Sequence, residues 1–422
     1  MKKLLTIALL VFTHTLLNAG GFQTGTQGSK AMGMGHAFVG QASDLSAIYF
    51  NAAGLTNLKG FNFMVGTTLI APSVEFTGPK PSTKSTKTVS RIFTPINLYG
   101  SYGVTEDLVV GLGVYNPFGL GSEWPKGWVG KSLATKTQLT TFYINPTVAY
   151  KLSDMLSVGA GVDVVLSSVH FYQEADFPPI PIAPGVFLPA APNVGINLEG
   201  SGDPAYTFNF GILFKPYDFL SLGLAYRHSA KLNFDGDLTF SNLPAKPAGY
   251  PIGHKDLFPD GKGKASLTMP YDLRFGVSVL PMNDLTVNAD VQYVGWESYK
   301  ELAVDFEKET AAWKDIKTEK NWKNSFTFRI GGEYRYSPFA FRLGYVYDGS
   351  PIPTSTMDPS LPGANRHEFT VGFGYQILRD LRADIAYQFI SFTVDVNDSK
   401  LNFNGQYKNA TNLVGVHLAY NF

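Results

Sequence analysis

The sequence contains no cysteine, which excludes a disulfide framework and any thiolate metal site. Lysine plus arginine and aspartate plus glutamate number 34 each, so there is no basic excess to attract nucleic acid. The 7 histidines form no HExxH motif, and no G-x-S-x-G motif occurs. We therefore predict neither an enzyme nor a bound metal or other cofactor. A membrane-embedded lipase, with serine and histidine brought together from separate strands, is the enzymatic alternative.

Long uninterrupted apolar runs are missing beyond the N-terminus, so no helix in that part of the chain could span a bilayer. The sequence is nevertheless 44% hydrophobic and 14% aromatic, which is too apolar for a disordered chain. If this is a membrane protein, it must be a β-barrel.

The N-terminus has the three parts of a secretory signal peptide. Lys2 and Lys3 provide the positive end, residues 4–17 the apolar region, and Leu17-Asn18-Ala19 the small-residue end. We predict a signal peptide over residues 1–19, cleaved near Ala19 or Gly20. No cysteine follows it, which excludes a lipoprotein anchor.

Residues 20–59 are rich in glycine, alanine and small polar residues and show no sustained alternation of apolar and polar positions. From residue 60 to 422 the alternation hardly stops. A compact glycine-rich segment followed by a long all-β chain indicates a plug, or hatch, and the wall around it.

The wall region divides into segments of about ten residues with period two, the length at which a tilted strand crosses a bilayer. The alternation is clearest over residues 285–293, where Leu285, Val287 and Ala289 are separated by Thr286 and Asn288. Periodicity alone fits either a soluble sandwich, with its apolar face inward, or a membrane barrel, with its apolar face outward.

The connections favour the barrel, because short and long ones alternate along the chain as if they lay on opposite sides of a membrane. The six short connections are Thr105-Glu106-Asp107, Ser153-Asp154, Tyr217-Asp218, Met282-Asn283-Asp284, Ser337-Pro338 and Arg379-Asp380. Six hairpins and one strand at either end predict an all-β fold, a 14-stranded antiparallel transmembrane β-barrel with an N-terminal hatch inside its lumen. The strands are expected at 61–75, 90–104, 108–116, 138–151, 155–170, 204–216, 219–231, 264–281, 285–298, 322–336, 339–348, 366–378, 381–394 and 411–422.

The last strand ends in an apolar row that terminates on Phe422 and resembles the signal by which outer-membrane barrels are recognised for assembly. We therefore expect the barrel-assembly machinery as a partner. Aromatic residues near other strand ends predict girdles at the membrane interfaces: Tyr99, Tyr102, Tyr143, Tyr150, Tyr345 and Tyr347. A soluble periplasmic β domain with these aromatics in its core is the alternative.

The order of several motifs resembles the long-chain fatty acid transporter (FadL) family over essentially the whole mature chain. The motifs are Gly21-Phe22-Gln23, Met32-Gly33-Met34-Gly35-His36-Ala37-Phe38, Tyr49-Phe50-Asn51-Ala52-Ala53-Gly54-Leu55-Thr56, Tyr115-Asn116-Pro117-Phe118-Gly119 and Ile144-Asn145-Pro146-Thr147-Val148-Ala149-Tyr150. The resemblance implies a monomeric barrel in the outer membrane of a Gram-negative bacterium. It further implies passage of hydrophobic molecules into the barrel and out sideways through a gap made by a kink in the third strand.

One departure from the family pattern lies in the hatch motif Asn51, Ala52, Ala53 and Gly54, because the family usually has Asn-Pro-Ala there. Without proline the turn has one less fixed φ and one more backbone N–H, so it is expected to be less rigid.

The candidate substrate-binding residues come from several segments. Phe22 is implied by the resemblance, which places the mature N-terminus near an internal binding site; the alternative is that it only packs the plug. Phe118, Leu120, Trp124 and Trp128 follow the third strand and could equally be interfacial anchors. Phe187 lies in the apolar, proline-rich loop 177–189, which could form the entrance or a lid without a ligand role.

The strand phases point five arginines and five acidic residues into the lumen: Arg227, Arg274, Arg329, Arg342, Arg382, Asp163, Asp272, Asp290, Glu333 and Asp384. Most of these are expected to pair with each other and to hold the hatch. Arg227 and Arg382 are the candidates for binding a substrate carboxylate. Gly111 and Gly113, in the short third strand, are the candidates for the lateral gap.

Three functions fit the sequence. The first is passive uptake of long-chain fatty acids, and the second is uptake of monoaromatic or other hydrocarbons. The third is a surface adhesion or binding barrel whose lumen stays shut. The expected partners are a hydrophobic small molecule, outer-membrane lipid and lipopolysaccharide, with no nucleic acid, and the chain is expected to be a monomer.

Overall fold

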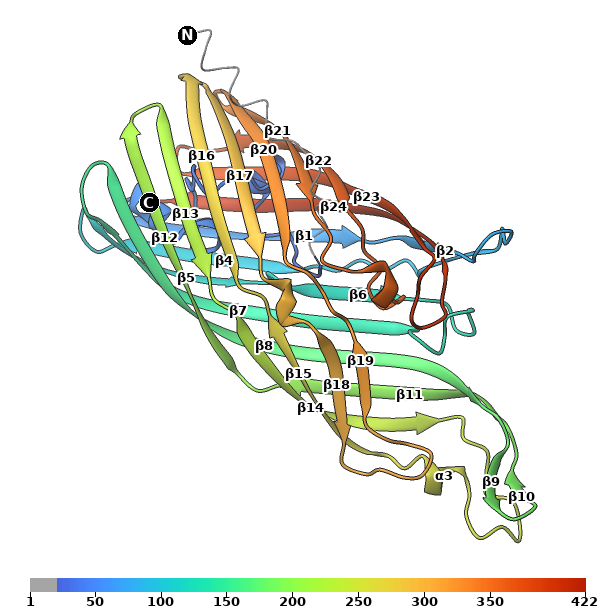
Figure 1. Ribbon diagram of the computed structural model, residues 1–422. Helices are drawn as coiled ribbons and strands as arrows, with labels where there is room; N and C mark the ends of the chain where they lie inside the picture. The colour runs from blue at the N-terminus through green and yellow to red at the C-terminus, as the bar shows by residue number, and fades with distance from the viewer. Residues whose placement is uncertain (1–20) are drawn as a thin grey trace.

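The computed structural model describes residues 21–422, so the predicted signal peptide lies outside the described residues. The chain forms a closed antiparallel barrel of 14 wall strands (Figure 1). Some wall strands are single elements: β7 (Lys136–Lys151), β8 (Leu156–Phe177), β21 (Phe339–Asp348), β22 (Arg366–Gln376), β23 (Leu381–Val396) and β24 (Gly405–Asn421). The others are each split in two: β1 (Phe61–Ala71) with β2 (Val74–Thr77), β3 (Ser85–Lys87) with β4 (Ile96–Gly103), β5 (Leu108–Tyr115) with β6 (Gly119–Glu123), β11 (Ala191–Gly202) with β12 (Ala205–Tyr217), β13 (Leu220–Arg227) with β14 (Ala230–Ser241), β15 (Gly261–Met269) with β16 (Asp272–Met282), β17 (Leu285–Val294) with β18 (Glu301–Phe306), and β19 (Ile316–Glu319) with β20 (Ser325–Tyr336).

The barrel closes where β1 pairs with β24, from Asn62 opposite Asn421 to Ala71 opposite Asn412. All six predicted tight turns join neighbouring wall strands; Ser153-Asp154, for example, lies between β7 and β8. The predicted fold class and strand number are therefore confirmed. Among residues 21–422, no helix has the length and apolar character needed to cross a membrane.

The apolar face of the wall points outward and the polar face points into the lumen. On β17, Val287 is 37% exposed, whereas Asn288 and Asp290 are 1% and 6% exposed. A soluble sandwich would bury its valines and expose its aspartates, so this arrangement excludes the sandwich and fits a wall surrounded by lipid.

Aromatic residues gather on the outer surface near both ends of the wall. Tyr102 and Tyr150 are 55% and 46% exposed near the tight turns, as predicted for a girdle. The prediction for Tyr99 and Tyr143 is wrong, because both side chains are buried in the lumen. Tyr99 lies an odd number of positions from Tyr102, as Tyr143 does from Tyr150, and successive residues of a strand face opposite sides.

The segment predicted as the hatch lies inside the barrel and consists of short helical turns: α1 (Ser29–Gly33), α2 (Ala47–Phe50) and the 3-10 helix η1 (Ala52–Asn57). The wall anchors it through buried hydrogen bonds. The carboxylate oxygen Oδ2 of Asp290 accepts from the backbone N–H groups of Phe38 and Val39, at 2.7 and 2.9 Å. The Asn51 side chain donates to the carbonyl of Ile212 in the wall and to that of Val39 within the hatch itself.

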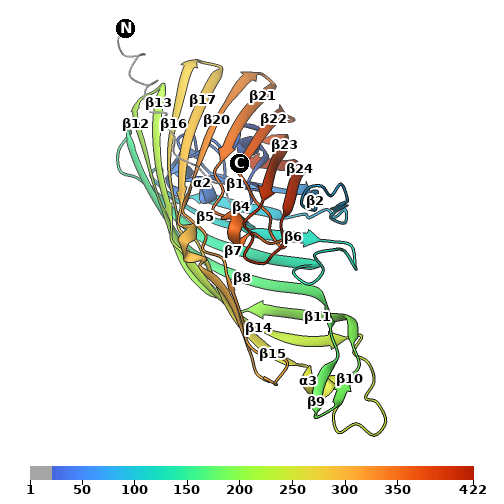
Figure 2. The same cartoon turned by 45° about the vertical axis from the view of Figure 1, so that its right-hand side comes forward.

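One side of the wall continues well beyond the rest, as β8, β11, β14, β15, β18 and β19 (Figures 1 and 2). The 22 residues of β8 span about 70 Å at 3.3 Å per residue, longer than an ordinary membrane crossing needs even when tilted. The far end carries the hairpin of β9 (Ile180–Ala183) and β10 (Val186–Leu188) and the short helix α3 (His254–Leu257). It has a separate apolar core built around Phe258, Phe240 and Trp313. We call these continuing strands the extension.

Candidate functional site

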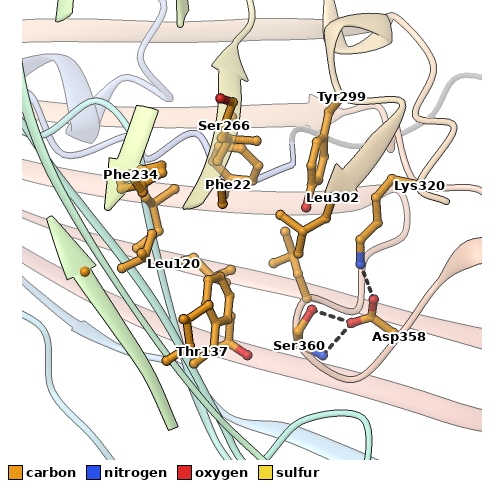
Figure 3. Close-up of a pocket in the computed structure, with 18 of the residues that line it drawn as sticks. Phe22, Leu120, Thr137, Phe234, Ser266, Tyr299, Leu302, Lys320, Asp358 and Ser360 are labelled. Atoms are coloured by element: carbon orange, nitrogen blue, oxygen red, sulfur yellow. Dashed lines mark hydrogen bonds and ion pairs between the residues drawn. The ribbon is translucent and has the colours of Figure 1, made fainter. Parts of the chain in front are cut away.

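An apolar cavity of about 70 Å³ lies where the hatch, the extension and the long loops meet (Figure 3). Phe22 lines it from the hatch and Leu120 from β6. The strands and loops add further apolar side chains: Leu139, Val169, Phe171, Leu198, Phe234, Leu267, Tyr299, Leu302, Trp322, Ile352 and Leu361. We call this space the outer cavity, and its lining suits an apolar chain or ring.

Phe22 is the centre of an aromatic cluster that closes the outer cavity toward the hatch. Its ring lies edge-on to Trp296, with centroids 4.8 Å apart, and 5.6 Å from the ring of Trp322. The rings of Phe118 and Tyr299 lie at 6.1 and 6.2 Å. Such ring pairs stabilise the position of the N-terminal end of the hatch beyond the effect of burial alone.

The polar end of the outer cavity is an ion pair between Lys320 and Asp358, which ties two loops together (Figure 3). The backbone N–H of Ser360 donates to the same carboxylate at 2.8 Å, and Thr356 Oγ1 donates to the Lys320 carbonyl at 2.5 Å. Burial lowers the pKa of Lys320, but the Asp358 carboxylate outweighs burial and raises this pKa above its ordinary value of 10.5. Burial likewise raises the pKa of Asp358, and Lys320 outweighs it, so that this pKa lies below 3.8.

A second, larger cavity of about 390 Å³ adjoins the outer cavity. The two cavities share Phe22, Leu120, Leu139, Ser360 and Leu361 as lining residues. The larger one is lined from both sides of the wall: Thr141 and Leu413 face the lumen, whereas Ile96 and Phe142 are exposed on the outer surface. Since neighbouring positions of a strand face opposite sides, a cavity lined by both faces must pass an open edge of the sheet. We call it the lateral cavity.

The open edge belongs to the third wall strand, which is interrupted between β5 and β6. Pairing between β4 and β5 ends at Leu98 opposite Val114, and β6 pairs only with β7. At the break, Asn116 substitutes for backbone pairing: its Oδ1 accepts from the Ile96 N–H at 3.1 Å, and its Nδ2 donates to the Thr141 carbonyl at 2.5 Å. The hatch borders the break too, with an isolated bridge between Gln23 and Phe118.

Gly111 and Gly113 do not interrupt the pairing, because both lie in the regular part of β5 and are paired with β4 and β7. Added Cβ atoms there would meet the hatch residue Ile48 at 3.2 and 2.9 Å. These glycines allow the hatch to pack closely against the wall, and the break begins a few residues after them.

Arg227 and Arg382 point into the lumen as predicted, but neither lines a cavity described above. Arg227 is buried against Asp163. Arg382 lies 2.8 Å from Asp384 and 3.9 Å from the hatch residue Asp44. Both guanidinium groups are therefore held by carboxylates of the protein itself.

Arg329 has a different environment, in a polar cavity of about 50 Å³ that shares Gln23, Thr24 and Glu368 with the lateral cavity. Its Nη2 donates to Gln292 Oε1 at 2.7 Å. No ion pair of Arg329 is found in the part of the chain that the structure describes, and its Nε has no hydrogen-bond partner there. Three acids line the same cavity, and each accepts from other donors: Asp290 from hatch amides, Glu368 from Gln388 and Asp348 from Thr327.

The other predicted binding residues divide into two groups. Phe118 and Leu120 line the lateral cavity. Trp124 and Trp128 are buried and stacked at 4.1 Å, and their indole N–H groups donate to the carbonyls of Pro359 and Ala134, so they hold loops together rather than lining either apolar cavity. Phe187 is 51% exposed in β10 at the far end of the extension, away from both cavities.

The hatch motif forms the turn into η1. Asn51 is extended, with φ −162° and ψ 101°, and its side chain accepts from the Ala53 N–H at 3.2 Å. An added Cβ at Gly54 would lie 2.4 Å from the Ala42 carbonyl oxygen, so only glycine fits there.

Sequence reasoning missed Trp296, Trp322 and Tyr299, the aromatic partners of Phe22. Trp296 and Tyr299 lie in the interruption between β17 and β18, and Trp322 lies in the one between β19 and β20. Aromatics near strand ends are ordinarily interface anchors. Only the docking of the N-terminal segment, far away in sequence, brings them together around Phe22.

Comparison with known proteins adds independent information. The family described as outer membrane protein transport protein (OMPP1/FadL/TodX) matches residues 10–422. A long-chain fatty acid transport protein of Escherichia coli O6:H1 is 25% identical over 417 residues, covering 92% of each chain. A Pseudomonas aeruginosa FadL homologue superposes with a TM-score of 0.78 at 19% identity, covering 96% of this chain and 100% of that one. The Ralstonia pickettii toluene transporter TbuX gives a TM-score of 0.70 at 19% identity, covering 97% and 99%.

Proposed function

This chain belongs to the OMPP1/FadL/TodX family of outer membrane transport proteins, and from that premise we propose that it takes up long-chain fatty acids passively and releases them sideways into the membrane at the third wall strand. Family membership establishes the outer membrane as its location and hydrophobic compounds as the class that the family transports. The substrate and the lateral path belong to the proposal, as does the inference that this chain transports rather than catalyses.

The observation that carries the proposal is the lateral cavity, which is lined by both faces of the wall at the break between β5 and β6. An apolar tail cannot gain from an aqueous pore, but it loses little free energy along an apolar path that leads into lipid. The hatch fills the barrel axis and is held to the wall by buried hydrogen bonds. A path around the hatch and through the wall therefore requires less rearrangement than a path along the axis.

The two cavities place Phe22 at a junction, since it lines both. A ligand that enters the outer cavity meets the aromatic cluster first and reaches the lateral cavity when Phe22 moves. We propose that residues 20–59 act as the hatch and that its N-terminal end, rather than η1, makes this movement. Apart from contacts near the break, such as Thr24 N–H to the Pro117 carbonyl at 2.9 Å, residues 21–23 are held by the ring contacts of Phe22 and by two long side chains of the wall. Arg366 donates to the Gly21 carbonyl at 2.8 Å, and Gln292 donates to Gln23 Oε1 at 3.2 Å.

Arg329 is our candidate for the fatty acid carboxylate, in place of Arg227 and Arg382. It borders the lateral cavity through the shared polar residues and makes no ion pair in residues 21–422, although Asp290 lies opposite it on β17 and Glu368 lines the same cavity. An arginine can bind a carboxylate through two parallel hydrogen bonds.

Uptake of monoaromatic hydrocarbons is the second candidate, favoured by the rings around Phe22, which would stack well on a small aromatic molecule. Binding of an uncharged hydrocarbon needs no cation in the lumen. The name of the toluene transporter TbuX, a structural neighbour, fits this candidate, and that of the Escherichia coli relative fits the first.

Uptake by proteoliposomes tests the proposal and separates the candidates. Purified protein should accelerate transfer of a fluorescent palmitate over protein-free vesicles, and Arg329→Gln should slow the acid but not the corresponding alcohol. Faster uptake of toluene than of palmitate, with no effect of Arg329→Gln, would favour the hydrocarbon. Tight binding to cells or matrix without any flux would favour the adhesion barrel.

A further inference from the structure

The break in the third wall strand leaves a bounded opening between residues 90–95 and residues 117–122. Its inner end is fastened by the Ile96 N–H donating to Asn116 Oδ1. Its outer end is fastened by the Val89 N–H donating to the Glu123 carbonyl at 2.7 Å and by the ion pair of Arg91 with Glu123, at 2.7 Å. Between these two contacts no backbone hydrogen bond joins the two segments in the described chain. We call this opening the window.

The two edges of the window overlap instead of meeting side by side. On β6, Leu120 is opposite the lumen-facing Leu139, so Gly121, opposite Gln138, belongs to the outer face. On the other edge, Phe93 is opposite Ile70, whose side chain packs inside the barrel against the cluster of Met32 and Leu413. Residues opposite each other in a sheet share a face, so Phe93 points toward the lumen. The Phe93 side chain points inward and yet meets the outer face of β6 at Gly121. Therefore β6 lies on the lumen side of residues 90–95.

The ring of Phe93 fills the space between the overlapping edges. A Cβ added to Gly121 would lie 2.1 Å from Phe93 Cζ and 2.5 Å from its Cε1, so the ring rests directly on the glycine backbone. The backbone of Phe93 is fixed separately, by two hydrogen bonds with Ile70 of 2.9 Å each. The ring can therefore turn about its side-chain torsions while the wall stays paired.

We propose that Phe93 is the shutter of the lateral window and that Gly121 is its seat. The inference rests on the proposed lateral release, and it names the residue that sets how wide a ligand can leave. Both residues line the lateral cavity, so the ring narrows the passage between the part of that cavity lined by lumen-facing residues and the part lined by outward-facing ones. A slim alkyl chain needs only a partial turn of the ring, whereas a tail that ends in a fused aromatic group needs the ring to leave its seat. Phe93 thus determines the cross-section of the ligands released.

The test uses Phe93→Ala and, as matched control, Phe142→Ala, which removes another aromatic ring of the same cavity that does not touch Gly121. Proteoliposome uptake is measured for palmitate and for a fatty acid that ends in pyrene. Phe93→Ala should accelerate the pyrene ligand about tenfold, equivalent to about 1.4 kcal/mol of barrier, and palmitate much less. Phe142→Ala should leave the ratio of the two rates as in the unmodified protein.

Gly121→Ala supplies an independent arm, because the new methyl group must push the ring away. It should also raise the pyrene-to-palmitate ratio, and it should have no further effect in a Phe93→Ala background, since the two residues act through one contact. Additive effects of the two changes would contradict the shutter.

The outcomes separate the inference from the function on which it rests. If the unmodified protein moves neither ligand faster than protein-free vesicles do, the proposed transport is wrong. If it transports both and Phe93→Ala keeps the same rate ratio, transport stands and the shutter is wrong. Should Phe93→Ala fail to give a folded barrel by heat-dependent gel mobility, Phe93→Leu, which keeps an apolar side chain, carries the same expectation with a smaller increase.

Discussion

Replacing Asp290 with alanine should loosen the hatch while leaving the barrel closed. Its carboxylate accepts the N–H groups of Phe38 and Val39 at 2.7 and 2.9 Å, and all three residues are buried. Without that acceptor, two buried donors lose their partners, at about 1–3 kcal/mol each, so local docking of the hatch should weaken by about 2–6 kcal/mol. The Asn51 bonds to Val39 and Ile212 persist, so the hatch should open locally rather than leave the lumen.

Hydrogen exchange of the amides of residues 38 and 39 measures this directly. Each 1.4 kcal/mol of lost docking should speed exchange about tenfold. Asp290→Asn keeps an acceptor oxygen and should lose less protection than Asp290→Ala. Exchange across β1 and β24 should stay unchanged and serves as the internal control for barrel closure. Unaltered exchange at residues 38 and 39 in Asp290→Ala would show that the hatch is anchored by other groups.

Three further predictions concern the hatch turn and the outer cavity. Ala52→Pro should stabilise the protein by about 0.4–1 kcal/mol in denaturant unfolding, because Asn51 is already extended and Ala52 opens the 3-10 helix; a large loss of folded barrel would contradict this. The Lys320–Asp358 ion pair should be fully formed between pH 3.8 and 10.5. It should be lost as the pH falls through the lowered pKa of Asp358 or rises through the raised pKa of Lys320, and Trp322 fluorescence should report both losses. Lys320→Met should expose the loop of residues 353–361 to protease, since removal of one partner of a buried pair costs about 3–5 kcal/mol; equal cleavage of both proteins would show that the pair does not hold the loops.

The wall could be predicted from the sequence because its signals are local. The alternation on β17 and tight turns such as Ser153-Asp154 depend on neighbouring residues alone, and they placed the strand ends at the tight turns within a few positions. The loop ends of the extension were missed: β8, expected over 155–170, runs to Phe177, and the wall strand of β11 and β12, expected over 204–216, begins at Ala191. The odd spacing of Tyr99 from Tyr102 was the same kind of signal and should have excluded a shared girdle. Strand phase also placed Arg227, Arg329 and Arg382 in the lumen correctly.

The site could be predicted only in part, because its contacts join segments far apart in the chain. The resemblance to known transporters pointed to Phe22, which the structure places between two cavities, but its partners Trp296 and Trp322 depend on how the hatch docks. Strand phase could not distinguish Arg227, paired with Asp163, from Arg329, which has no ion pair in residues 21–422. Phe187 was expected near the entrance, but the length of the extension carries it to the far end.

The break in the third strand shows the same limit. Glycine suggested a bend at Gly111 and Gly113, since it permits one, but the hatch packs against both and the pairing continues. The interruption falls at Asn116 and Pro117, where the proline lacks a donor and the asparagine side chain replaces the missing backbone contacts. Proline was the stronger signal, because it removes a hydrogen bond that glycine keeps.

The most direct test of lateral release is photo-crosslinking during uptake with a palmitate that carries a diazirine at the end of its tail. Mass spectrometry of the labelled protein identifies the path. If release is lateral, labels should appear first at Phe22 and Trp322, and then at Phe93 and Phe142 beside the window, with none at η1 of the hatch. Labels that run through η1 while Phe93 and Phe142 stay unmodified would show that the ligand passes along the barrel axis, and would contradict lateral release.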